Sequence, residues 1–152
     1  MAMRITSPVF DDGGRIPRKY TCDGVGVSPP LRFEGAPAGA VSLALVFDDP
    51  DAPGGVWDHW VIWNMPPATD RLEEGRPAPG VVGRNSWQRN AYGGPCPPDR
   101  EHRYRFTLYA LDSRLTLSDT AGVSALVTAM EGHVLARAQM TGLYVRPGRA
   151  RV

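Results

Sequence analysis

Apolar and polar residues alternate with a period of two in three segments, and this pattern predicts three long β-strands. Residues 41–48 carry apolar or small side chains on both faces, which indicates a strand buried on both sides. Residues 57–65 and 102–111 alternate in the same way. Pro50 and Pro53 follow the first strand, and since proline cannot donate to a sheet ladder, we expect a loop there.

One polar side chain stands out in the second of these strands. Strict alternation places His59 on the face of Trp57, Val61 and Trp63, which we expect to be buried. An unpaired buried polar group costs about 1–3 kcal/mol, so this histidine needs a hydrogen-bond partner. It is either a satisfied core histidine or part of a site.

Helical periodicity is confined to the last third of the chain. Val123, Leu126, Val127 and Met130 recur at helical spacing, with Ser118 or Asp119 as the expected cap and Gly132 as the expected end. We expect a second short helical turn over residues 133–138 and a closing strand over 143–145. The long connection over residues 68–101 is expected to be functional or to hide a short strand.

Length and composition fit one β-rich globular domain spanning residues 1–152. The chain has 152 residues, enough to close a hydrophobic core. It contains 17 glycines and 15 prolines without periodicity. Together with the strand pattern, this predicts a mostly β fold of short strands joined by rigid, irregular loops.

Charge and hydropathy narrow the function classes. The 17 basic and 16 acidic residues leave a net charge of +1, and the basic residues are scattered, which argues against a nucleic-acid binder. Only the segment from Arg146 to Arg151 is rich in them, and we interpret it as a frayed terminus rather than a nucleic-acid arm. No apolar run reaches the length of a membrane span, and no signal peptide precedes Phe10, so we expect a cytoplasmic protein.

Four polar residues lie at strand ends or strand–loop junctions, where binding sites concentrate. They are Asp49, Asp51, His59 and His102. The two aspartates could instead cap the turn with their own backbone, and Tyr104, which shares a face with His102, could be a core residue.

The two cysteines lie in loops rich in glycine and proline. Neither Cys22 nor Cys96 belongs to a Cys-x-x-Cys motif, and two cysteines cannot form a four-cysteine zinc site. They are either reduced thiols or, if their loops meet, a disulfide that closes a long loop.

Taken in order, several segments resemble the phosphatidylethanolamine-binding family. The first half is carried by Tyr20-Thr21-Cys22-Asp23-Gly24, Ser28-Pro29-Pro30-Leu31, Asp48-Asp49-Pro50-Asp51-Ala52-Pro53 and Trp57-Asp58-His59-Trp60. The second half is carried by Gly83-Arg84-Asn85, Tyr92-Gly93-Gly94-Pro95-Cys96-Pro97-Pro98 and His102-Arg103-Tyr104. Residues 131–136 resemble the late helix of the bacterial and archaeal branch, often called Raf-kinase-inhibitor-like.

The resemblance implies a large central antiparallel sheet flanked by a smaller sheet and short helices. It also implies a pocket for small anions and phospholipid headgroups, formed by Asp49, Asp51, His59, Cys96, Pro97, Pro98, His102 and Tyr104. Animal members carry a C-terminal helix that gates this pocket. The chain ends at Val152, so we expect no such gate.

A pocket containing two aspartates can still accept an anion. We expect protonated His59 and His102 to donate, with the aspartates raising their pKa values and orienting them. Backbone N–H groups of residues 93–96 can add a nest of donors. A zwitterionic headgroup would satisfy both kinds of partner.

Three function classes remain open. The first is a ligand-binding protein for a small anion or phosphoryl headgroup, without a cofactor. The second is an interaction module that inhibits a protease or a kinase. The third is a hydrolase that uses the carboxylates and histidines for acid–base chemistry or to bind a metal, although no Gly-x-Ser-x-Gly or His-Glu-x-x-His motif is present. Members of the bacterial branch that the chain resembles are often dimers, so we also expect a homodimer.

Overall fold

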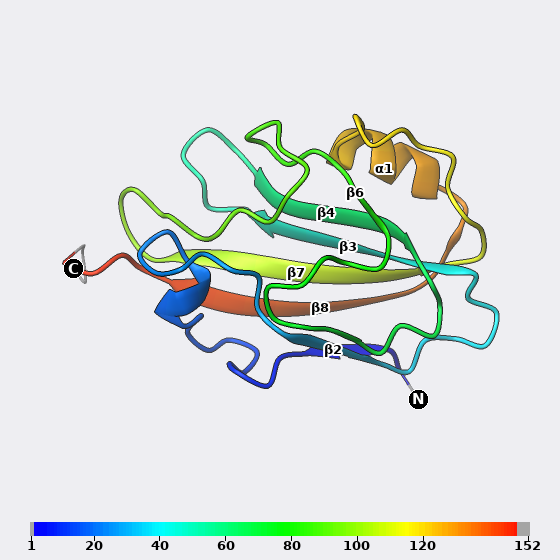
Figure 1. The fold of residues 1–152 in the computed structure, drawn as a ribbon, viewed down its shortest axis with the longest axis horizontal. Coiled ribbons are helices and arrows are strands. Elements are labelled where there is room, and N and C mark those ends of the chain that lie inside the picture. Colours follow the sequence, from blue (N-terminus) through cyan, green and yellow to red (C-terminus); the bar gives the residue numbers. More distant parts are fainter. Residues whose placement is uncertain (1, 149–152) are drawn as a thin grey trace.

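The computed structural model describes residues 2–148, which form two antiparallel sheets (Figure 1). The main sheet has five strands in the order β6-β4-β3-β7-β8, and the smaller sheet has three in the order β1-β2-β5. The strands are β1 Arg4–Thr6, β2 Leu31–Glu34, β3 Ser42–Asp49, β4 Trp57–Met65, β5 Arg71–Leu72, β6 Val81–Val82, β7 His102–Leu111 and β8 Val134–Tyr144. The helices are η1 Arg18–Tyr20, a 3-10 turn, and α1 Val123–Met130. This confirms the predicted fold class.

The larger core fills the space between the two sheets. It joins Ile5 and Phe33 of the smaller sheet to Phe47 and Phe106 of the main sheet. The rings of Phe47 and Phe106 stack with centroids 4.0 Å apart. Burial of this apolar surface is the main force that holds the sheets together.

A second, smaller core lies on the other face of the main sheet, under α1. Val46 and Trp63 of the sheet pack there with Leu126 and Met130 of the helix. β3 is therefore buried on both faces, as the sequence predicts, because one sheet covers one side and a helix the other.

The C-terminal part of the chain differs from the prediction. The second helical turn expected over residues 133–138 is wrong, because β8 begins at Val134 and extends to Tyr144. It pairs with β7 along its length, from Val134 opposite Leu111 to Tyr144 opposite His102. Sheet pairing outweighs the helix propensity of its alanines, leucine and arginine, which is a weak local preference.

Other boundaries follow local chemistry. Gly132 adopts a φ of 78°, a left-handed conformation that suits glycine and ends α1 as predicted. The expected cap at Ser118 or Asp119 is wrong: Gly122 is the N-cap and makes no side-chain hydrogen bond. Instead, the Ser118 hydroxyl accepts the Thr120 N–H at 3.2 Å in a local turn. The long connection contains β5 and β6, the short strands that it was expected to hide.

A β-bulge changes the direction of His59. Phe47 pairs with Trp60, but the next residue, Asp48, pairs with Asp58, so His59 is an extra residue in β4. Its ring lies 5.4 Å from that of Phe47 in the larger core, whereas Val61 and Trp63 belong to the smaller core. The predicted common face of His59, Val61 and Trp63 is therefore wrong, because the bulge interrupts the alternation.

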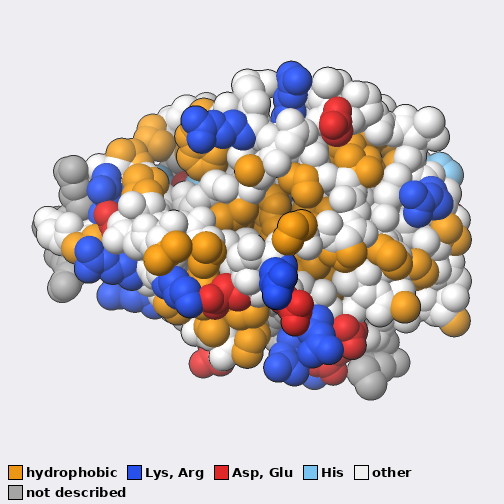
Figure 2. All heavy atoms as spheres, viewed as in Figure 1, with side chains coloured by type: hydrophobic (Ala, Val, Ile, Leu, Met, Phe, Trp, Pro, Cys, Tyr) orange, Lys and Arg blue, Asp and Glu red, His pale blue; other side chains and the backbone are white. Residues whose placement is uncertain are grey.

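Charged side chains are spread over the surface. On the face shown in Figure 2, Lys and Arg side chains are interleaved with acidic ones and do not form one continuous stripe. At the chain end, Arg146 donates to Asp23 at 3.0 Å, so this residue is anchored. Residues 149–151 of the segment predicted to fray lie outside the described residues. Within residues 2–148, no helix is long and apolar enough to cross a membrane.

Candidate functional site

A cavity of about 580 Å³ opens at the end of the main sheet where β3 ends and β7 begins. Six of the eight predicted site residues line it: Asp49, His59, Cys96, Pro98, His102 and Tyr104. They come from three adjacent strands and from the loop before β7. Antiparallel pairing of β3 with both β4 and β7 brings these distant segments together.

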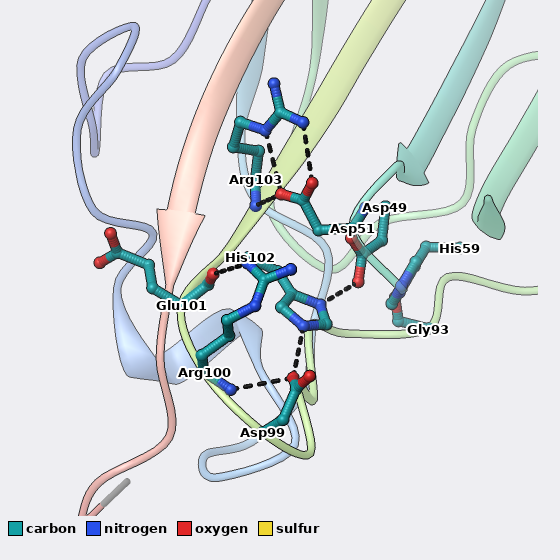
Figure 3. Close-up of polar contacts among 9 residues, drawn as sticks. All are labelled: Asp49, Asp51, His59, Gly93, Asp99, Arg100, Glu101, His102 and Arg103. Carbon is teal, nitrogen blue, oxygen red and sulfur yellow. Dashed lines mark hydrogen bonds and ion pairs between the residues drawn. The ribbon is translucent and has the colours of Figure 1, made fainter. Parts of the chain in front are cut away.

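His102 lies between two carboxylates in the floor of the cavity (Figure 3). Its Nδ1 is 2.6 Å from Asp49 Oδ2, and its Nε2 is 2.7 Å from Asp99 Oδ1. An ionised carboxylate oxygen only accepts, so with both Asp49 and Asp99 ionised, both ring nitrogens donate and the ring carries a positive charge. The ring is fully buried, so its charge is balanced by these two partners rather than by water.

Asp49 has both carboxylate oxygens in use. Oδ2 accepts from His102, and Oδ1 accepts the backbone N–H of Asp51 at 2.8 Å. The residue therefore caps its own turn and also orients the imidazole. The two roles that the sequence left open as alternatives coexist in one side chain.

His59 has a different environment. Its Nδ1–H donates to the carbonyl oxygen of Gly93 at 2.8 Å, which leaves Nε2 with a lone pair and no hydrogen-bond partner among the described residues. Burial lowers the pKa of His59, and this effect outweighs the opposing influence of the Gly93 carbonyl and of the Asp49 charge. The expectation of a protonated His59 with a raised pKa is therefore wrong, because desolvation dominates.

Tyr104 brings a hydroxyl group to the same cavity. Its ring centroid is 5.4 Å from that of His59. Its buried hydroxyl lies near the Asp49 carboxylate and the Cys96 backbone, but it makes no hydrogen bond of good geometry among the described residues. Burial, followed by the nearby charge of Asp49, raises the pKa of Tyr104, so the hydroxyl keeps its proton. Trp63 Nε1 and Arg84 Nε are also buried without partners, but neither residue lines the cavity.

Asp51 and Pro97 do not line the cavity. The carboxylate of Asp51 accepts the backbone N–H of Arg103 at 2.9 Å and two guanidinium hydrogen bonds at 2.8 and 3.0 Å. These hydrogen bonds hold the pKa of Asp51 well below its usual range. Asp51 thus ties the loop after β3 to the beginning of β7, while Pro97 is buried away from the cavity lining.

Sequence reasoning missed two kinds of residue in this site. Asp99, the second partner of His102, lies three residues before it in a loop, and an acidic residue at that short spacing was the available signal. Trp87 lines the cavity beside Trp57, with ring centroids 5.4 Å apart. Nothing in the pattern around Trp87 distinguishes it from a core tryptophan.

A buried asparagine positions Trp87. Asn85 Oδ1 accepts the backbone N–H of Trp87 at 2.9 Å, and Asn85 Nδ2 donates to the carbonyl oxygen of Ala91 at 2.8 Å. Gly93 lies beneath the indole, where a Cβ would collide with the ring. The loop is therefore shaped to hold this tryptophan at the mouth of the cavity.

The cavity wall is crosslinked to a distant loop. Cys22 and Cys96 form a disulfide, and they are 74 residues apart in the chain. The backbone N–H of Cys22 also donates to the carbonyl oxygen of Pro95 at 3.1 Å. Within residues 2–148, no group of three or more His, Cys, Asp or Glu residues is arranged to hold a metal ion.

The fold and the cavity define a class of antiparallel β protein with a polar pocket at one end of its central sheet. The family model for phosphatidylethanolamine-binding protein matches residues 6–145 of the chain. The chain therefore belongs to the phosphatidylethanolamine-binding protein family, and membership implies ligand binding.

Relatives and solved structures agree with this family. The UPF0098 protein of Methanothermobacter thermautotrophicus is 51% identical over 150 residues, which cover 95% of this chain and 99% of that protein. A Chlamydia trachomatis protein, described as a phosphatidylethanolamine-binding protein homolog, has a structure with a TM-score of 0.93 at 43% identity, covering 95% of this chain and 98% of that one. Escherichia coli YbcL, described as a new member of the mammalian PEBP family, gives a TM-score of 0.88 at 27% identity, covering 96% of this chain and 99% of that one.

Proposed function

We propose that the cavity binds a small phosphoryl-bearing ligand of the headgroup type, in which the negative phosphoryl group is accompanied by an ammonium group. The observation that carries this proposal is the pair of unsatisfied groups facing one cavity, the Tyr104 hydroxyl and His59 Nε2. One is a donor and the other an acceptor, so together they match a phosphoryl oxygen and a protonated ligand group.

The charge of the cavity favours a zwitterion over a simple anion. Among residues 2–148 no Lys or Arg lines the cavity, and a positive charge on His102 is already balanced by Asp49 and Asp99. A bare dianion would therefore find neutral donors but no uncompensated positive charge. A ligand that carries its own ammonium avoids this penalty.

The mouth of the cavity supplies a surface for that ammonium. Trp57 and Trp87 are 37% and 43% exposed, and their rings meet nearly edge to face at 78°. A cation over an exposed tryptophan face gains about 0.5–1 kcal/mol. The phosphoryl group would then lie deeper, against Tyr104.

Calorimetric titration with phosphoethanolamine and with inorganic phosphate tests the proposal. We expect phosphoethanolamine to bind more tightly than phosphate. Tyr104→Phe removes only the hydroxyl and is expected to weaken phosphoethanolamine about tenfold, the equivalent of one hydrogen bond to a charged group. His59→Ala should weaken it by a similar factor.

Tyr109→Phe is the matched control, because Tyr109 lies on the same strand but packs against the smaller core on the other face of the sheet. We expect its affinity for phosphoethanolamine to equal that of the unmodified protein. The proposal is wrong if Tyr104→Phe and His59→Ala both bind as tightly as Tyr109→Phe.

A further inference from the structure

The wall of the cavity between Gly93 and Asp99 has few backbone anchors. Three of the five residues in between are prolines, Pro95, Pro97 and Pro98, which have no N–H to donate. In the described chain, the Pro95 carbonyl accepts from Cys22. Gly94 also packs against the backbone of Tyr20 and Thr21, and the disulfide at Cys96 is the covalent link from this segment to the 20–22 loop.

Both ends of this short segment set the position of a histidine. Gly93 accepts the Nδ1–H of His59 at 2.8 Å, and Asp99 accepts the Nε2–H of His102 at 2.7 Å. Cys96 and Pro98 themselves line the cavity. A change in the middle of the segment therefore moves the cavity wall directly. It also reaches the His59 ring through Gly93 and the His102 ring through Asp99.

The two cysteine residues differ in their access to solvent. Cys22 is exposed at the surface, whereas Cys96 is half-buried in the cavity wall. Thiol–disulfide exchange needs an approach to one sulfur, and exposed disulfides are the labile ones. An attacking thiolate reaches Cys22 first, and Cys96 becomes the leaving group.

We propose that the Cys22–Cys96 disulfide is a thiol-exchange site through which low-molecular-weight thiols modify Cys22 and loosen the cavity wall. The thiolate of the small thiol attacks Cys22 Sγ. The Cys22–Cys96 bond breaks, a mixed disulfide forms on Cys22, and Cys96 leaves as a thiolate that takes a proton from water. A second small thiolate then attacks the small-thiol sulfur of this mixed disulfide. Cys22 leaves as a thiolate that takes a proton from water, and the two small thiols depart joined as a disulfide.

The first test follows the chemistry without any ligand. The oxidised protein is treated with glutathione, quenched with an alkylating reagent and analysed by peptide mass spectrometry. We expect the glutathione adduct on Cys22 and the alkyl group on Cys96. An adduct found mainly on Cys96, or a disulfide that glutathione does not open while the protein stays folded, overturns the proposal.

The second test follows the consequence, and it rests on the proposed function. Phosphoethanolamine is titrated into the oxidised protein and into the protein reduced with dithiothreitol, with circular dichroism confirming that both are folded. We expect the reduced form to bind about tenfold more weakly. Cys22→Ser should bind as weakly as the reduced form with or without dithiothreitol, and equal affinity of the oxidised and reduced forms overturns the regulatory part.

A failure of the proposed function is distinguishable from a failure of this inference. If the oxidised protein binds no phosphoethanolamine, the function is wrong, and the inference is then decided by backbone amide spectra recorded before and after reduction. Shifts that reach the backbone amides of Gly93, Asp99, His59 and His102 support it. Shifts confined to the immediate neighbours of the two cysteines overturn it. The Cys22→Ser/Cys96→Ser double variant, whose spectrum should not respond to dithiothreitol, is the control.

Discussion

The two ends of the main sheet are built on opposite principles. At the end near α1, residues such as Leu43 and Leu111 are fully buried and pack against other hydrocarbon. At the cavity end, the same strands carry Asp49 and His102, which are also buried but are held by hydrogen bonds. At the first end, side-chain volume decides stability. At the second, every buried polar group needs a partner, and the groups without one mark the place where we propose that a ligand binds.

The largest change in the free energy of unfolding is expected from removing the disulfide at the cavity end. In the chain-entropy model, a disulfide between residues 74 apart stabilises the fold by about 4 kcal/mol. The Cys22→Ala/Cys96→Ala double variant should lose about that much in urea unfolding under oxidising conditions. Under reducing conditions the variant and the parent protein should unfold at similar urea concentrations. Equal stability under oxidising conditions would contradict the prediction.

A void created in the apolar core should lower the stability of the protein but leave the affinity of the binding cavity unchanged. Leu45 is fully buried in the middle of β3, and Leu45→Ala is expected to cost about 3 kcal/mol from lost burial and the void left behind. Leu45→Met keeps the volume and should cost less than about 1.5 kcal/mol. Phosphoethanolamine affinity, measured at temperatures where each variant is folded, should match that of the parent.

Asp49 lines the cavity and Asp51 does not, so substituting each in turn compares the cavity with its surroundings. Asp49→Asn leaves the buried imidazolium of His102 without one of its carboxylates and should cost about 2 kcal/mol, together with a clear loss of ligand affinity. Asp51→Asn weakens a pair with the mostly exposed Arg103 and should cost about 0.5 kcal/mol with little change in affinity. Equal effects of the two substitutions on urea unfolding and on calorimetric affinity would show that the distinction between them is wrong.

A smaller, pH-dependent effect is expected from Asp58, which lies opposite Asp48 across β4 and β3. Burial, followed by the Asp48 charge, raises the pKa of Asp58 from 3.8 to about 6, with Arg105 opposing. The folded state then binds more protons than the unfolded state between about pH 4 and 6, so this residue's contribution to stability falls as pH rises through that window. Asp58→Asn should remove that dependence and add up to about 1 kcal/mol at pH 7, after allowance for solvent screening. Unfolding curves across pH 4–7 that match those of the parent protein would contradict this.

The sequence carries most of the fold but not its irregularities. The long strands follow from alternation because one periodicity applies along each of them, and the end of α1 follows from Gly132. The bulge at His59 could not be predicted, since it depends on how β4 pairs with β3 and not on β4 alone. β8 was misread over residues 133–138, because its pairing with β7 is a long-range property that outweighs local propensity.

The site divides in a similar way. The motifs brought Asp49, His59, His102 and Tyr104 together, and these four residues line one cavity. The protonation state of His59 could not be predicted, since its desolvation depends on the packed rings of Phe47 and Trp87. Asp51 shares a motif with Asp49, yet its carboxylate faces Arg103, because the loop turns between the two residues.

The most direct test is the imidazole ¹⁵N spectrum of the protein at pH 7, recorded with and without saturating phosphoethanolamine. Without ligand, His59 should show a protonated Nδ1 and a bare Nε2, while His102 should show two protonated nitrogens. On addition of the ligand, the His59 Nε2 resonance should move strongly and the His102 pair should remain doubly protonated. Binding that leaves the His59 nitrogens unchanged, while resonances far from this cavity shift, would contradict the account.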